Sequence, residues 1–260
     1  MTCDQSAICR VYGSSVRGPS HRENGLPCQD AFAFKVIDTS RGVIVVADGL
    51  GSARLAETGA SLVVEAAVEY WCAEQPPDPK FGVRAALTAA RTALIAKAAE
   101  LQCALHDLAT TLMVVCFDHE TVTVAHIGDG AVVCQTALGI ELLSGPGASE
   151  YTNEVDPLTS DSWAELIRID QMSGARAVAA FTDGCQRAGL RRIMKRPEPV
   201  AEFFEPLFKF VAELEPGQDG DSEIRELLEC EKFQVNSEDD KTLVIATLTG
   251  RVDDVYAKGI

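Results

Sequence analysis

The sequence has few of the residues that would mark a zinc-binding or disulfide-stabilised protein. Only 4 of its 260 residues are histidine, and no two of its 9 cysteines form a C-x-x-C pair. Neither a zinc knuckle nor a thioredoxin-type pair is therefore present. The cysteines are odd in number and scattered, and several lie in apolar runs, as small buried hydrophobic residues do. This usage predicts a reduced, cytoplasmic protein.

Long apolar runs and excess positive charge are also missing. No stretch reaches the roughly 18 apolar residues of a spanning helix, and the first residues lack the charged and apolar segments of a signal peptide. The chain has 23 Lys and Arg against 39 Asp and Glu, a net charge of −16. We therefore expect no binding to nucleic acid or to an anionic membrane, because both require a positive surface. The acid excess can serve solubility alone, or it can include carboxylates that bind hard cations.

The remaining composition is that of an ordinary globular protein. The chain is 47% hydrophobic and 24% charged, which is typical of a folded soluble protein. The length allows one large domain or two small ones. Because no internal repeat and no convincing linker is present, we expect a single domain over residues 1–260.

Hydrophobic periodicity predicts the secondary structure. Helical spacing predicts helices over 55–74 and 80–101, and helical patterns interrupted by prolines continue over 187–231. The segment 144–161 is rich in turn residues and predicts a loop. Apolar runs and alternation predict strands at 7–17, 30–38, 42–48, 110–117, 121–128, 175–183 and 241–248. This order favours an α+β fold with helices packed outside antiparallel sheets.

Aspartates recur at the ends of the predicted strands. Asp48, Asp129 and Asp183 each end a strand segment and are followed by glycine, Asp239 and Asp240 precede the last strand, and Asp30 begins the second. A single Asp-Gly pair usually marks an ordinary turn. Several strand ends that converge would instead bring carboxylates together, and these repel one another unless a cation joins them. Mg²⁺ or Mn²⁺ fits an all-oxygen site of this kind.

Five blocks of the sequence resemble the metal-dependent Ser/Thr protein phosphatases of the protein phosphatase 2C type. In order along the chain these blocks are CQDAF (28–32), VVADGLGSA (45–53), ATTLMVV with VAHIGDG (109–130), FTDG (181–184) and SEDDKTLVIAT (237–247). The resemblance covers about residues 10–248, and the blocks are similar to those of a bacterial branch of the family. It implies a four-layer α-β-β-α sandwich, in which two central antiparallel sheets are flanked by helix pairs.

The resemblance also implies a centre of two Mn²⁺ or Mg²⁺ ions. It makes Asp48 the ligand that bridges both ions, with the Gly49 carbonyl on one ion and Asp183 and Asp239 on the other. Asp30 is implied to lie beside the cluster and to act mainly through bound water. Asp129 is implied to serve a weaker third metal. Asp48, Asp183 and Asp239 are thus the expected catalytic residues.

The implied reaction is hydrolysis of phosphoserine or phosphothreonine in a protein by a water that two metals activate. The implied partners are a phosphorylated signalling protein and a cognate Ser/Thr kinase. The sequence departs from many eukaryotic members in two places. Leu50 occupies the position of a histidine thought to protonate the leaving group, and leucine has no proton to donate. The phosphate-binding arginine has no aligned equivalent, so His21 and Arg22 are the candidates for substrate binding.

Two questions stay open at this stage. The basic run 187–196 has helical spacing at Leu190, Ile193 and Met194, which predicts either a solvated helix face or a dock for an acidic or phosphorylated partner. The interpretation as a phosphatase also has two alternatives. One is a non-catalytic module that binds a partner through the same scaffold. The other is a hydrolase of small phosphorylated metabolites.

Overall fold

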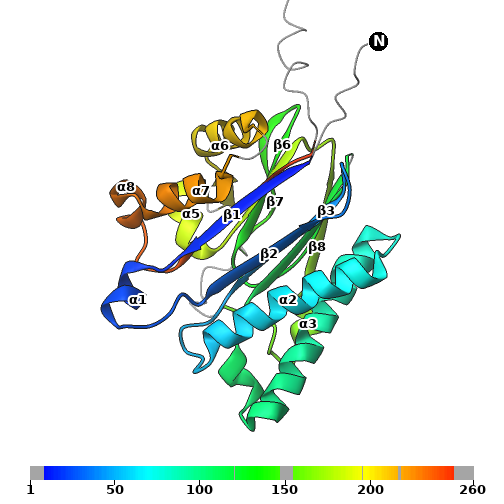
Figure 1. Ribbon diagram of the computed structural model, residues 1–260, viewed down its shortest axis with the longest axis vertical. Coiled ribbons are helices and arrows are strands. Elements are labelled where there is room, and N and C mark those ends of the chain that lie inside the picture. Colours follow the sequence, from blue (N-terminus) through cyan, green and yellow to red (C-terminus); the bar gives the residue numbers. More distant parts are fainter. Residues whose placement is uncertain (1–8, 120, 147–154, 195, 216–217, 249–260) are drawn as a thin grey trace, which may run out of the picture.

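The protein contains two five-stranded antiparallel sheets that pack face to face (Figure 1). The computed structural model describes residues 9–119, 121–146, 155–194, 196–215 and 218–248. The first sheet, in spatial order, consists of β1 (Arg10–Val16), β12 (Lys241–Thr247), β9 (Ala177–Phe181), β6 (Ala131–Thr136) and β7 (Gly139–Ser144). The second sheet consists of β2 (Asp30–Val36), β3 (Gly42–Asp48), β4 (Leu112–Phe117), β5 (Thr121–Ile127) and β8 (Arg168–Ser173).

A pair of helices covers the outer face of each sheet (Figure 1). Helices α2 (Ala56–Glu74) and α3 (Pro79–Leu101) pack on the second sheet, and α6 (Ala201–Glu213) and α7 (Gly220–Glu229) pack on the first. The predicted four-layer α-β-β-α sandwich is thus confirmed. The shorter elements are α1 (Pro19–Glu23), η1 (Leu105–Leu108), α4 (Trp163–Leu166), η2 (Asp183–Cys185), α5 (Gln186–Gly189), β10 (Leu190–Ile193), β11 (Arg196–Pro199) and α8 (Glu231–Gln234).

The central strands are apolar at nearly every position because both of their faces are covered. In β3, Val43 and Val45 point to the helices α2 and α3, while Ile44 and Val46 point to the other sheet. In β12, Leu243 and Ile245 contact the α6 and α7 layer, whereas Val244 and Ala246 face the second sheet. Each of the two strands therefore contacts both a helix layer and the opposite sheet. The ends of β3 and β12 place Asp48 and Asp239 at the same end of the sandwich.

Most predicted helices and strands are confirmed, with bounds that differ by no more than three residues. The prediction of a helix over 187–196 is wrong. That segment forms the short helix α5 and then strand β10, which pairs with β11 in a two-stranded hairpin. Pro197 and Pro199 lie in β11, and prolines there prevent a helix from continuing through the segment. Lys195 lies outside the described residues, as does the stretch 147–154 of the predicted loop.

Other differences concern a proline and the less hydrophobic strands. Pro206 lies inside the continuous helix α6, whose buried face includes Phe204 and Phe208. No separate pattern predicts β6, β7 or β8; of these, β7 and β8 are only half-buried and lack a long apolar run. In the described part of the chain, no helix combines the length and the apolar character needed to cross a membrane.

Candidate functional site: a carboxylate-lined cavity at the strand ends

Aspartates from four strand ends line one cavity of about 280 Å³. Asp48 ends β3, Asp129 lies between β5 and β6, Asp183 follows β9, and Asp239 lies just before β12. These residues are far apart in sequence, yet antiparallel pairing of β6 with β9 and of β9 with β12 brings their ends together. The cavity therefore contains the four carboxylates that the sequence placed at strand ends.

Asp30 lies behind this cavity rather than in its lining. It faces Asp48 across the β2–β3 pair, and its buried carboxylate accepts hydrogen bonds from the hydroxyls of Thr182 (2.7 Å) and Thr242 (2.8 Å). Burial raises the pKa of Asp30 well above its usual value, with smaller contributions from Asp240 and Asp183. The implied role of Asp30, beside the cluster and acting mainly through bound water, stays a prediction.

Burial and mutual repulsion disfavour the ionised forms of the lining carboxylates in the absence of a cation. The pKa of Asp48 is raised well above its usual value by burial first and then by the charges of Asp30 and Asp183. The pKa of Asp183 is raised to about 7 by burial and by Asp129 and Asp239, although a hydrogen bond with Asp48 opposes this. Burial also raises the pKa of Asp129. A bound cation would reverse these effects by favouring the ionised carboxylates.

In the described part of the structure, one atom in the cavity lacks the hydrogen-bond partner that a buried polar atom normally has. Oδ1 of Asp183 is buried and has no hydrogen-bond partner among the described residues. A buried polar atom without a partner is energetically unfavourable. The surrounding donors are carboxylate and carbonyl oxygens, which are the ligands that Mg²⁺ and Mn²⁺ prefer. The residues present therefore fit a divalent metal centre.

Backbone contacts fix the strand end that carries Asp48. Its N–H donates to the Thr111 hydroxyl (3.0 Å), and its carbonyl accepts from the Thr111 N–H (2.8 Å) and the Thr110 hydroxyl (2.9 Å). The next residue must be glycine, because a Cβ on Gly49 would lie 2.6 Å from the carbonyl oxygen of Ala56. The sequence reasoning missed the two threonines, although they stand within the ATTLMVV block.

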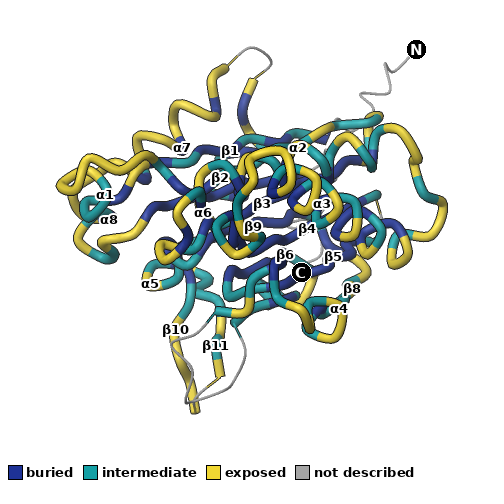
Figure 2. The backbone as a smooth tube through the Cα atoms, turned by 90° about the horizontal axis from the view of Figure 1, so that it is seen from below, coloured by how far each residue is buried: buried dark blue, intermediate teal, exposed yellow. Residues whose placement is uncertain are grey.

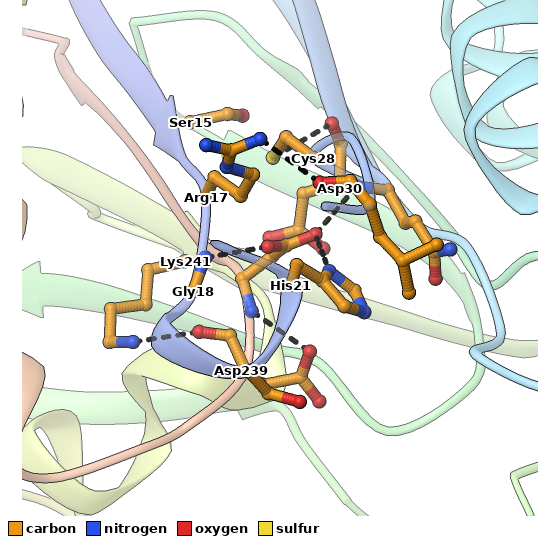
Figure 3. A network of polar contacts seen from close by, with 12 residues as sticks. Ser15, Arg17, Gly18, His21, Cys28, Asp30, Asp239 and Lys241 are labelled. Atoms are coloured by element: carbon orange, nitrogen blue, oxygen red, sulfur yellow. Dashed lines mark hydrogen bonds and ion pairs between the residues drawn. The ribbon is translucent and has the colours of Figure 1, made fainter. Parts of the chain in front are cut away.

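Asp240 forms a hub of hydrogen bonds that the sequence did not reveal. Its Oδ1 accepts from the Gly18 N–H (2.7 Å), and its Oδ2 accepts from the Gln29 N–H (2.5 Å) and from Nδ1 of His21 (2.8 Å). Figure 3 shows Gly18, His21 and Asp239 around this network. Asp240 therefore ties α1 and the start of β2 to the loop that carries Asp239. The Asp-Asp pair before the last strand was the only available signal, and it did not distinguish the two residues.

Lys241 holds the same loop from the other side. Its side chain is buried, and Nζ donates to the carbonyls of Ser237 (2.8 Å) and Asp239 (2.7 Å), as Figure 3 shows in part. Burial lowers the pKa of Lys241, with nearby Cys185 and Asp239 opposing that shift. His21, Asp239 and Asp240 also offer ligand atoms within 4.8 Å of one another.

His21 and Arg22 differ in their relation to the cavity. His21 is among the residues that line it, together with Leu50. Arg22 is exposed, is not among the lining residues, and donates to Oε1 of Gln234 at 2.6 Å. Leu50 donates its backbone N–H to Ala109 and packs in a small apolar cluster. The structure thus brings only one of the two substrate-binding candidates to the carboxylates.

His126 is a core histidine in β5. It is fully buried, and its Nδ1 contacts the Ser144 hydroxyl (3.0 Å) and Nη2 of Arg168 (3.1 Å). Burial, followed by the charge of Arg168, lowers the pKa of His126 well below 6.5. Arg168 also donates to the Gly128 carbonyl (2.9 Å), next to Asp129.

Comparison with known proteins identifies the class of this enzyme. The family model described as "Protein phosphatase 2C" matches residues 17–229, which is most of the chain. The chain therefore belongs to the protein phosphatase 2C family, and the predicted family and its metal-dependent Ser/Thr phosphatase activity are confirmed.

Among curated proteins, the chain is similar to serine/threonine-protein phosphatase 3 of Escherichia coli K12. The two sequences are 32% identical over 248 residues, and the alignment covers 91% of this chain and 96% of the relative. Among solved structures, it is similar in fold to the serine/threonine phosphatase PstP/Ppp of Mycobacterium tuberculosis, with a TM-score of 0.62, 16% identity, and 93% and 99% of the two chains covered. A structure of the PstP catalytic domain in complex with 2 manganese ions has a TM-score of 0.60, 16% identity and the same coverage.

Proposed function

We propose that this protein hydrolyses phosphoserine and phosphothreonine in protein substrates at the carboxylate-lined cavity. The observation that carries the proposal is the convergence of Asp48, Asp129, Asp183 and Asp239 on one cavity, with a buried Asp183 oxygen that lacks a partner among the described residues. The curated name of the Escherichia coli relative supports the choice of substrate.

We propose the cation ligands that the family resemblance implies, all of which line the cavity. Asp48 would contact two ions, with the Gly49 carbonyl on one and Asp183 and Asp239 on the other, and Asp129 would serve a weaker third. When bound, a pair of Mn²⁺ or Mg²⁺ ions neutralises phosphoryl charge and activates water as a nucleophile. Asp30, whose two threonine donors hold it behind Asp48, would support the cluster rather than bind an ion directly.

The protein's own contribution is to hold these oxygens in place before the substrate arrives. Thr110 and Thr111 fix the backbone of Asp48, and Lys241 fixes the loop of Asp239. Oriented groups of this kind stabilise the transition state because they need no reorganisation during the reaction.

His21 is the residue we propose for binding the phosphoryl group. A carboxylate can only accept hydrogen bonds, so the contact with Asp240 places a proton on Nδ1 and leaves Nε2 as the ring atom available to a ligand. In the imidazolium form, Nε2 donates to a phosphoryl oxygen. Arg22 would first have to release Gln234, which makes it the weaker candidate.

Several broader expectations remain proposals. We infer a cytoplasmic location, supported by the eight described cysteines, which are all free thiols. We also infer one domain over 1–260, since both sheets contribute to a shared core. We further infer a bacterial origin, supported by the similarity to the Escherichia coli relative. A role in signalling and a cognate Ser/Thr kinase are the proposals that a phosphoprotein substrate favours.

The test measures phosphate release from a phosphothreonine peptide by the full chain with Mn²⁺, with Mg²⁺ and with EDTA. We expect metal-dependent release that EDTA abolishes, and almost none from Asp48→Asn. A wild-type protein that binds metal but is inert toward all phosphate esters would favour the non-catalytic module. Turnover restricted to small phosphorylated metabolites would favour the second alternative.

A further inference from the structure

The hairpin that follows the Asp183 loop concentrates positive charge on an acidic protein. Arg187 in α5 and Arg191, Arg192 and Arg196 in β10 and β11 are all exposed. None of the four makes an ion pair with a carboxylate in the described part of the chain, although Glu198 lies opposite Arg191 in the hairpin register. We call this segment, residues 187–194 and 196–199, the arginine hairpin.

These unpaired charges create a local field opposite in sign to that of the rest of the molecule. The chain carries 39 acidic residues against 23 basic ones, so the surrounding surface repels anions at long range. A cluster of arginines within such a surface attracts anionic groups locally and orients them. The arginine hairpin is thus a place where an acidic ligand is favoured over a neutral or basic one.

The turn of the hairpin adds an apolar component. Ile193 is 39% exposed and Met194 is 93% exposed, and Met194 has a φ of 47°, in the left-handed region that few non-glycine residues adopt. Methionine and arginine are enriched in protein–protein interfaces relative to other surfaces. The combination favours a protein segment with acidic and apolar side chains over a nucleic acid, for which Ile193 and Met194 would serve no purpose.

The base of the arginine hairpin is fixed to the catalytic loops. The Gln186 side chain, in α5, donates to the Asp129 carbonyl (2.7 Å). Gly189 packs so closely against Phe204 and Phe181 that an added Cβ would lie 3.0 Å and 3.2 Å from their rings, and its carbonyl accepts from the Val200 N–H (2.9 Å). Figure 2 shows β10 and β11 extending away from the body beyond this anchored base.

We propose that the arginine hairpin docks an acidic segment of the substrate protein that flanks the phosphorylated residue. The carboxylates of this segment would contact the four arginines, and an apolar side chain would pack on Ile193 and Met194. The inference rests on the proposed phosphatase function and names the substrate feature that the enzyme selects. It also explains how an acidic enzyme can retain an acidic phosphoprotein.

The experiment compares phosphothreonine peptides that differ only in their flanks. Each peptide carries a flank of five residues, placed four to eight residues from the phosphothreonine, which spans about 14–28 Å in an extended chain. The flank consists of one leucine with four glutamates, four glutamines or four lysines. With the full chain and saturating Mn²⁺, we expect the acidic peptide to have a KM about tenfold lower than the neutral one at low salt, with similar kcat. The difference should shrink as ionic strength rises.

The variant Arg191→Glu/Arg192→Glu should remove this preference and leave hydrolysis of p-nitrophenyl phosphate unchanged. The matched control is Arg84→Glu/Arg225→Glu, which makes the same change in net charge at exposed arginines on α3 and α7 and should keep the preference. Met194→Ser should raise the KM for the acidic peptide, but not for the same acidic peptide with its leucine replaced by serine. Equal effects of the hairpin and control variants would overturn the inference.

A binding measurement separates this inference from the catalytic proposal. Fluorescence anisotropy follows an unphosphorylated acidic peptide as it binds to wild type and to both double variants. Binding that only the hairpin variant loses supports the inference. It does so even if the protein hydrolyses no phosphopeptide, because an absence of hydrolysis would contradict only the proposed function. Single-stranded DNA that binds as tightly as the acidic peptide, and loses binding in the same variant, would show a general polyanion site and overturn protein docking.

Discussion

Two aspartates at neighbouring strand ends have opposite surroundings. Asp240 is buried and accepts three hydrogen bonds, from Gly18, Gln29 and His21. Asp183 has a buried oxygen with no partner among the described residues, and burial together with neighbouring carboxylates raises its pKa. Asp240 is therefore a structural residue whose role is complete in the folded chain, whereas we propose that Asp183 binds a cation.

The difference distinguishes residues that stabilise the structure of the site from residues that would take part in metal binding and catalysis. The loss of a satisfied structural carboxylate should weaken the fold. The loss of an unsatisfied one should affect metal binding and turnover and leave the metal-free fold intact.

Asp183→Asn should reduce metal-dependent phosphate release by more than about 100-fold, because even the outer partners of metal ligands typically contribute 10–100-fold. The metal-free variant should melt no earlier than the wild type, since the substitution removes one of several repelling charges. Steady-state kinetics and thermal unfolding without metal measure the two effects. A variant that keeps a tenth of wild-type activity would contradict the ligand assignment.

Asp240→Ala should destabilise the protein by about 3 kcal/mol, because it leaves the N–H groups of Gly18 and Gln29 without their buried acceptor. Asp240→Asn keeps one acceptor and should lose roughly 1 kcal/mol. Asp221→Ala, which removes a single acceptor from the Gly13 N–H, is the control for one such bond. Chemical denaturation measures all three, and equal stability of Asp240→Ala and Asp221→Ala would refute the role of Asp240 as a hub.

Metal should stabilise the protein more at high pH than at neutral pH. In the metal-free state the pKa of Asp183 is raised to about 7, above the value near 4 of an unfolded aspartate. A raised folded pKa contributes stability at low pH that is lost as the pH rises through about 7. The metal-free Tm should therefore fall between pH 6.5 and 8.5, and Mg²⁺ should raise the Tm by about 3 °C more at pH 8.5.

The lower limit of this pH range is set by His126. Because burial lowers the pKa of His126 well below 6.5, the unfolded state binds an additional proton below that pH, and stability falls there for a separate reason. A shift on adding Mg²⁺ that is the same at pH 6.5 and 8.5 would exclude repulsion among the carboxylates as the cause.

Lys241→Met should weaken Mg²⁺ binding by about tenfold, as expected for a residue that positions a ligand without contacting the ion. The variant removes the donor to the carbonyls of Ser237 and Asp239, so its stability should fall by about 1–2 kcal/mol. The value of kcat at saturating metal should change little. Lys35→Met, which removes an exposed lysine from β2, should leave the metal affinity unchanged.

The sequence predicted the framework of this protein well because its signals are local. Val43 to Val46 are apolar at consecutive positions, which marks a strand covered on both faces, and α2 and α3 show uninterrupted helical spacing. The half-buried strands β7 and β8 gave no such signal. In the basic run, the spacing of Leu190, Ile193 and Met194 imitated a helix, while β-pairing and two prolines decided the outcome.

By itself, the sequence determined which residues stand at the strand ends, and therefore that Asp48, Asp129, Asp183 and Asp239 would be candidates for one metal centre. Only the tertiary structure decided which carboxylates are already satisfied. Gly18 and Gln29, which hold Asp240, are more than 200 positions away from it in the chain, and no spacing rule connects such residues. The role of a carboxylate depends on the donors that folding brings to it, and those donors come from the whole chain.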